Sequence, residues 1–218
     1  MAGYEQREIS VFEVTVPWIL GMCIDCTVSI SDKDFEAMQG GIKDFLLNVH
    51  RRSYDLPDLP SDFIALTAFK DKDEIFGPPS PLREVKMDQS GHVDALCQWV
   101  DRLKNDGKAT ALHDAIVIAS DEVQEIDSRL ANDYLKIIVA ITDGEDNDSR
   151  TPLSQLQYFR TTDLHLAVIA AGNTASPELR ALDKFATSTH AIDRFDELFY
   201  AITITVEEII EKTVRIDW

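Results

Sequence analysis

Four apolar segments of strand length divide the chain, and helical periodicity fills the intervals between them. These segments are residues 18–24, 63–69, 137–141 and 164–171. Each is bounded by polar or turn residues and is apolar except for Thr67 and His165, so both faces of each strand are expected to be buried. A parallel sheet with helices on both faces buries such strands. The pattern therefore predicts an α/β fold with a mostly parallel, doubly wound central sheet that has helices on both faces.

Apolar positions that recur with a period of about 3.6 residues predict three amphipathic helices. Their apolar faces are formed by Phe35, Met38, Ile42, Phe45, Leu46 and Val49, by Leu112, Ala115, Ile116, Ala119, Val123 and Ile126, and by Phe195, Leu198, Phe199, Ile202, Val206, Ile209 and Ile210. Ser31 and Asp34 stand at the spacing of a capping box before the first helix. Thr151-Pro152 and Ser176-Pro177 each place a capping hydroxyl before a proline, which predicts two further helix starts.

The length of 218 residues suits one domain with a sizeable core. Residues 1–15 are expected to form an N-terminal extension or an extra strand, because apolar positions alternate there with one slip of register. Residues 16–218 are then the domain itself. Residues 70–88 contain three prolines, which predicts a loop or an edge hairpin because proline cannot donate to a central ladder.

The amino-acid composition limits the kinds of molecule that the protein is expected to bind and the compartment in which it is expected. The chain has 39 Asp and Glu against 21 Lys and Arg, a formal net charge of −18, so nucleic acid and anionic lipid are expected to be repelled. No apolar run is long enough to span a bilayer, and the first ten residues lack the apolar stretch of a secretion signal. Three cysteines do not make a disulfide framework, which agrees with a reducing compartment. We therefore expect a cytoplasmic protein without membrane insertion.

Polar oxygen donors stand at the ends of the predicted strands and at the start of a predicted helix. They are Asp25, Thr27, Ser29, Thr110 and Asp143. In an open parallel sheet, ligands bind beyond the carboxyl ends of the strands, where Asp25 and Asp143 are expected. Three hydroxyls and two carboxylates suit a small octahedral cation, Mg²⁺ first and Mn²⁺ or Ca²⁺ as alternatives. An open coordination position would take an acid from a partner.

Three separated motifs resemble the von Willebrand factor type A domain. They are Asp25-x-Thr27-x-Ser29, Gly107-x-x-Thr110-Ala111-Leu112-x-Asp114-Ala115 and Ile138-x-x-Ile141-Thr142-Asp143-Gly144-Glu145. The resemblance extends from about Val16 to the last predicted helix. It implies a Rossmann-like fold with a metal-ion-dependent adhesion site at the carboxyl edge of the sheet. The chain departs from the usual motif at Thr27, Val28 and Ile30, where serine, glycine and methionine are commoner.

The resemblance also implies roles for the candidate residues. Thr27, Ser29 and Thr110 would contact the cation directly or nearly so, whereas Asp25 and Asp143 would act directly or through water. A carboxylate from a protein ligand commonly completes such a site in the family. The function expected is therefore a non-enzymatic protein-binding module that recognises an acidic side chain through a divalent cation. The partner, the pathway and the oligomeric state are not defined by the sequence.

Two alternatives remain open at this level. One is a metal-independent scaffold of the same fold, in which the hydroxyls only cap helices and bond the backbone. The other is a metal-assisted phosphatase or hydrolase with Asp25 as nucleophile, although Thr27 occupies the position where such phosphatases have a second acid.

Cys23 and Cys26 are expected on opposite faces of a strand end, as core residues. The acids in residues 145–148 are expected in a solvated loop.

Overall fold

The computed structural model describes residues 16–55, 60–80, 82–144, 146–171 and 177–214. The extra strand predicted within residues 1–15 lies outside these ranges.

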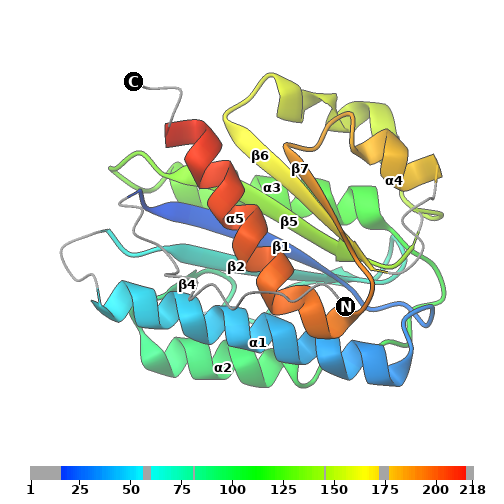
Figure 1. Cartoon of the computed structure of the whole chain (residues 1–218), viewed down its shortest axis with the longest axis horizontal. Coiled ribbons are helices and arrows are strands. Elements are labelled where there is room, and N and C mark those ends of the chain that lie inside the picture. The colour runs from blue at the N-terminus through cyan, green and yellow to red at the C-terminus, as the bar shows by residue number, and fades with distance from the viewer. Residues whose placement is uncertain (1–15, 56–59, 81, 145, 172–176, 215–218) are drawn as a thin grey trace, which may run out of the picture.

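Seven strands in the described part of the chain form one sheet, ordered β3-β2-β1-β5-β6-β7, with β4 also paired to β2 (Figure 1). The parallel strands are β1 (Trp18–Asp25), β2 (Phe63–Phe69), β5 (Leu135–Thr142), β6 (Leu164–Ala171) and β7 (Ser188–Ile192). The short strands β3 (Ile75–Phe76) and β4 (Val85–Lys86) run antiparallel to β2, as predicted for an edge hairpin. The four predicted strands are confirmed. Strand β7 was not predicted, because Ser188, Thr189 and His190 leave it without a continuous apolar run.

Helices cover both faces of this sheet, which confirms the predicted fold class (Figure 1). The helices are α1 (Asp32–Asp55), α2 (Ser90–Val100), α3 (Leu112–Asp127), α4 (Pro177–Leu182) and α5 (Leu198–Val214), with 3₁₀ helices η1 (Leu153–Arg160) and η2 (Phe195–Glu197). In Figure 1, α1, α2 and α5 lie in front of the sheet and α3 lies behind it. None of the described helices is long and apolar enough to cross a membrane.

Strand β1 separates the two halves of the core. Trp18, Leu20 and Met22 face the cluster formed with α1, α2 and α5, whereas Ile19 and Cys23 face the cluster formed with α3 and η1. This alternation follows from the two-residue period of a strand. Cys26 belongs to the first cluster, so the two thiols lie on opposite faces, as predicted. All three cysteines of the chain are free.

The helix starts agree only in part with the capping predictions. The Ser31 hydroxyl accepts the Asp34 N–H at 3.2 Å, which is one of the two bonds of a capping box, but the Asp34 carboxylate accepts the Ser31 hydroxyl at 2.6 Å in place of the Ser31 backbone N–H. Helix α4 begins at Pro177, as predicted. At Thr151-Pro152 a 3₁₀ helix, η1, does begin at Leu153, but the predicted cap is wrong, because Pro152 is at the N-cap position and no side chain caps the helix. The backbone N–H of Thr151 instead donates to Asp114 at the start of α3, at 2.8 Å.

The register of the parallel strands brings their carboxyl ends together. Ile24 of β1 lies opposite Ile141 of β5, so the next residue of each strand, Asp25 and Thr142, ends its strand at the same level. The turn from β1 into α1 and the loop after β5 therefore meet at one edge, at the right of Figure 1. This edge carries the candidate residues.

Gly21 determines how closely α3 packs on β1. A Cβ atom at this position would lie 2.9 Å from Ile138 Cδ1, 3.0 Å from Val123 Cγ2 and 3.3 Å from the Ala119 carbonyl oxygen. We expect Gly21→Ala to lower the free energy of unfolding by roughly 1–3 kcal/mol through overpacking, as measured by urea denaturation. Gly40→Ala is the matched control, because nothing lies within 4 Å of its added methyl group. That helix substitution should stabilise by about 0.5–1 kcal/mol. Equal stability of Gly21→Ala and wild type would contradict the packing account.

Candidate metal centre

Asp25 is a buried carboxylate that joins the β1 turn to strand β5. One carboxylate oxygen accepts the Thr27 backbone N–H at 3.0 Å, and the other accepts the Thr142 hydroxyl at 2.7 Å. Its side chain is fully buried. Burial raises the pKa of Asp25 to about 6, although the hydrogen bonds from Thr142 and Thr27 oppose that shift. Asp25 therefore shapes the turn that presents Thr27 and Ser29.

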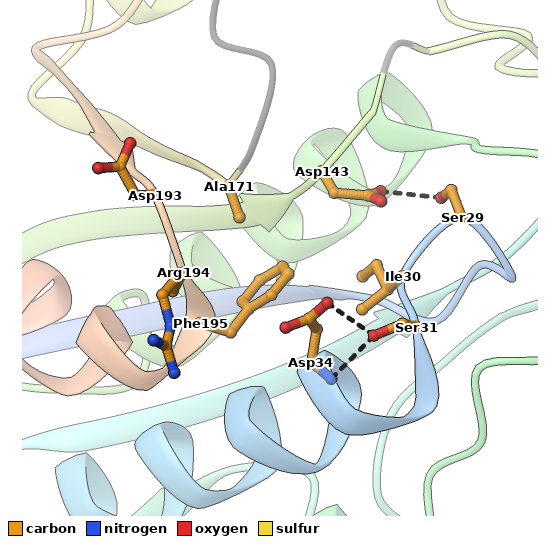
Figure 2. Close-up of a pocket in the computed structure, with 9 residues that line it drawn as sticks. All are labelled: Ser29, Ile30, Ser31, Asp34, Asp143, Ala171, Asp193, Arg194 and Phe195. Carbon is orange, nitrogen blue, oxygen red and sulfur yellow. Dashed lines mark hydrogen bonds between the residues drawn. The ribbon is translucent and has the colours of Figure 1, made fainter.

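A short chain of oxygen atoms crosses from this turn to the loop after β5. The hydroxyls of Thr27 and Ser29 lie 2.7 Å apart, and the Ser29 hydroxyl donates to the Asp143 carboxylate at 2.8 Å (Figure 2). Asp143 is half-buried, and this burial raises its pKa, with a smaller contribution from the charge of Asp34. The structure thus joins Asp25, Thr27, Ser29 and Asp143 in one network.

Thr110 is held beside this network by its backbone. Its N–H donates to the Asn147 side-chain oxygen at 2.8 Å, and its carbonyl accepts the N–H groups of Asn147 at 3.0 Å and Asp148 at 3.1 Å. The preceding loop is bound to the β1 turn, because the Val28 N–H donates to the Gly107 carbonyl at 2.8 Å. Within the described residues, no hydrogen bond joins the Thr110 hydroxyl to the other four candidates.

Gly107 permits this close approach of the two loops. A Cβ atom there would lie 2.6 Å from Cβ of Lys70 and 3.0 Å from the Cys26 carbonyl oxygen. The Lys70 side chain has little freedom to move away, because it is mostly buried and pairs with Asp106 at 2.5 Å and Glu74 at 3.2 Å. A side chain at position 107 would therefore displace the turn that carries Thr27.

The loop after Asp143 is anchored at residues 146–148, which corrects the expectation of a solvated loop there, whereas Glu145 lies outside the described residues. Asp146 pairs with Nδ1 of His113 on α3 at 2.7 Å, and both side chains are buried. Asp148 pairs with Lys72 at 2.7 Å. These partners lie more than 30 residues away in the sequence, so a local run of acids could not indicate them.

Sequence reasoning also missed Asn147 and Asp114 as residues that position the site. The Asp114 carboxylate accepts the backbone N–H groups of Arg150 at 2.9 Å and Thr151 at 2.8 Å, and its own N–H donates to the Ser149 hydroxyl at 3.1 Å. Asp114 had one signal, since it stands in the second quoted motif and in the first turn of α3. Asn147 had none, because its role depends on a contact across 37 residues.

The oxygen donors have a geometry compatible with a small cation. Among the described residues, no group of three or more His, Cys, Asp or Glu side chains could hold a metal ion. A cation here would instead depend on hydroxyls together with Asp143, which are hard oxygen ligands. Adjacent ligands about 2.1 Å from an octahedral ion lie roughly 3 Å apart. The 2.7 and 2.8 Å separations along Thr27, Ser29 and Asp143 are close to that value.

A cleft of about 190 Å³ opens beside these oxygens (Figure 2). Ser29 and Asp143 line it on the side of the candidate centre, and Asp193 and Arg194, which follow β7, line the other side. Val28, at the tip of the β1 turn, is 60% exposed. Of the candidate residues, the exposed Ser29 and the half-buried Asp143 are accessible to a ligand from outside, whereas Asp25, Thr27 and Thr110 are buried.

The raised pKa of Asp25 predicts a pH-dependent stability of the metal-free protein. Because the folded state holds the Asp25 proton more tightly than the unfolded state does, the contribution of Asp25 to stability is fully present only below the unfolded pKa of about 3.9. It falls as pH rises through the folded pKa of about 6. Relative to wild type, Asp25→Asn should therefore gain up to about 3 kcal/mol between pH 4 and 7, measured by urea unfolding with a chelator present. Parallel pH profiles would contradict the burial of this charge.

Comparison with solved structures relates this arrangement to known folds. The pilus adhesin SpaC from Lactobacillus rhamnosus GG, in its open conformation, aligns with a TM-score of 0.69 at 10% identity, over 90% of this chain and 30% of that one. A von Willebrand factor type A protein from Catenulispora acidiphila aligns with a TM-score of 0.65 at 17% identity, over 89% and 43%. Proximal thread matrix protein 1 from the mussel byssus, with a zinc-occupied MIDAS motif, aligns with a TM-score of 0.64 at 13% identity, over 88% and 47%.

This chain spans less than half the length of each of these structures. No match was found among curated protein sequences. A family model of the von Willebrand factor type A domain matches residues 20–203, which include all five candidate residues. The chain belongs to the von Willebrand factor type A domain family.

Proposed function

We propose that the protein is a binding module that recognises an acidic side chain of a partner protein through a divalent cation. Thr27, Ser29, Thr110 and Asp143 would hold the cation, and Asp25 would orient the turn or act through water. The observation that carries this proposal is the Thr27–Ser29–Asp143 oxygen chain, which opens onto a cleft. Mg²⁺ is the first candidate, with Mn²⁺ and Ca²⁺ as alternatives.

Each residue has a distinct part in this proposal. The Ser29 side chain is exposed, so it lies where cation and ligand would meet, whereas Thr27 and Thr110 are buried and would approach from below. Asn147 holds the backbone of Thr110 in place. The bound cation would supply a positive centre for a carboxylate oxygen, which the strongly acidic chain could not otherwise attract.

The comparisons support this proposal at the level of the family. Domains of this family are typically protein-interaction modules, and one structural neighbour is described with zinc in the corresponding kind of motif. Another neighbour is a pilus adhesin. At identities of 10–17% these structures support the fold alone, so the ion and the partner of this chain belong to the proposal.

The state of Asp25 argues against the enzymatic alternative. A nucleophilic carboxylate needs an oxygen free to attack, but both oxygens of Asp25 accept hydrogen bonds and the side chain is fully buried. In the metal-independent scaffold, the Thr27 and Ser29 hydroxyls would serve only in the hydrogen bonds that link the β1 turn to Asp143. A measurement of cation binding distinguishes the metal-dependent binding module from the metal-independent scaffold.

Cation binding should raise the melting temperature, because a ligand that binds only the folded state stabilises it. At about 100 times the dissociation constant, Mg²⁺ or Mn²⁺ should add roughly 2.7 kcal/mol, or about 5–10 °C in a protein of this size. Asp25→Ala and Thr110→Ala should abolish the shift, whereas Thr189→Ala, on the exposed side of β7, should keep it. A wild-type melting temperature that millimolar cation leaves unchanged would favour the scaffold instead.

The carboxylate requirement can be tested with a pair of peptides that differ in one group. In fluorescence polarisation, a labelled Gly-Ser peptide with one Glu should bind in Mg²⁺, and the same peptide with Gln should not. A chelator or Ser29→Ala should weaken binding of the Glu peptide by at least about tenfold, as loss of a metal contact does. Equal binding of both peptides, or binding indifferent to the chelator, would exclude recognition through a cation.

A further inference from the structure

The cleft beside the candidate centre has a size and lining suited to one side chain. Its volume of about 190 Å³ is below the roughly 300 Å³ at which small-molecule sites begin. Ile30, Ala171 and Phe195 give it an apolar lining and are themselves buried. Such a surface accepts the methylene stem of a long side chain, whose charged end then reaches the polar rim.

The charges around the cleft favour a cation at that rim. Asp34 and Asp193 line the cleft together with Asp143, and Arg194 is the basic residue among its lining residues. Figure 2 shows the Asp34 carboxylate between the candidate centre and Phe195. The charge of Arg194 is already offset, because its guanidinium pairs with Asp196 at 2.6 Å. The two charges of a bound cation would be offset by Asp143 and by the ligand's own carboxylate, so Asp34 and Asp193 would leave a net negative potential for a second acidic group of the ligand.

We propose that the cleft accepts a lysine or arginine side chain that lies within a few residues of the partner's metal-bound acid. The partner segment would then carry both charges, its carboxylate directed to the cation and its basic group to Asp34 and Asp193. This inference rests on the proposed function, since it assumes the carboxylate contact at the centre. If it holds, the protein would prefer partner segments that carry a basic residue near the metal-bound acid, a preference that the candidate centre alone would not produce.

The geometry of Asp34 makes the inference testable by a mild substitution. One oxygen of Asp34 accepts the Ser31 hydroxyl at 2.6 Å, and an amide oxygen can take over that contact. Asp34→Asn therefore removes the charge and keeps the start of α1. Asp44→Asn is the matched control, because Asp44 is an exposed acid on the same helix, ten residues away and outside the cleft lining.

The experiment measures fluorescence polarisation of labelled nonapeptides with one central Glu in a Gly-Ser background. A second position, one to four residues on either side, carries Lys, Gln or Glu. In Mg²⁺, the best Lys peptide should bind the wild-type protein about twofold to fivefold more tightly than its Gln counterpart, the range of an exposed ion pair. The second Glu should weaken binding. Asp34→Asn or Asp193→Asn should reduce the Lys preference, and Asp44→Asn should leave it intact.

Three results would contradict the inference, and they differ in what else they exclude. If the Glu peptides bind in Mg²⁺ but Lys gives no gain over Gln, or a second Glu binds most tightly, the cleft has no basic preference and the proposed function survives. If no peptide binds in a cation-dependent manner, the proposed function fails together with the inference. A Lys preference that persists in both cleft variants would also contradict the assigned role of these carboxylates.

Discussion

The buried carboxylate of Asp25 is the interaction on which the candidate centre depends. It accepts one hydrogen bond from the turn that follows β1 and another from Thr142 at the end of β5. These two contacts join neighbouring parallel strands at their carboxyl ends and set the path of the chain through Thr27 and Ser29. A buried charge is costly unless it is hydrogen-bonded, so the site is maintained only while both donors stay in place. The buried carboxylate of Asp25 therefore helps to hold the exposed Ser29 hydroxyl in position.

Two further loops complete the arrangement through backbone contacts. Gly107 allows the loop before α3 to lie against the β1 turn, and Asn147 binds the backbone of Thr110 from the loop after β5. Ion pairs to Lys72 and His113 anchor that second loop. The candidate residues thus lie on elements whose positions are determined by packing and hydrogen bonds, which suits recognition by a preformed site.

The fold could be predicted from the sequence because its strongest signals are local. Doubly buried strands such as residues 137–141 run apolar without interruption, and the apolar period of residues 112–126 matches one helical face. Strand β7 has a mixed composition, and Thr151 has the local form of a helix cap but donates its backbone N–H to Asp114 instead. A local sequence pattern cannot indicate a hydrogen-bond partner that lies 37 residues away, as Asp114 does from Thr151.

Part of the candidate site could likewise be predicted, for the reason that parallel strands align their carboxyl ends. Asp25, Thr27, Ser29 and Asp143 do meet in one hydrogen-bonded network. The supporting residues Asn147 and Asp114 could not be derived in the same way, since nothing in their neighbourhood shows which loop they contact. It could not be predicted from the sequence that Asp34 and Asp193 line the same cleft, because most of the chain separates them.

Crystals of the protein soaked in Mn²⁺ and measured at the manganese absorption edge test the central claim most directly. The account predicts one anomalous peak between the hydroxyls of Thr27, Ser29 and Thr110, with ligand distances of about 2.1 Å, as for a small octahedral cation. The hydrogen bond between Thr27 and Ser29 should then be replaced by contacts to the ion. An absence of any peak at this edge of the sheet, with that hydrogen bond retained, would contradict the account.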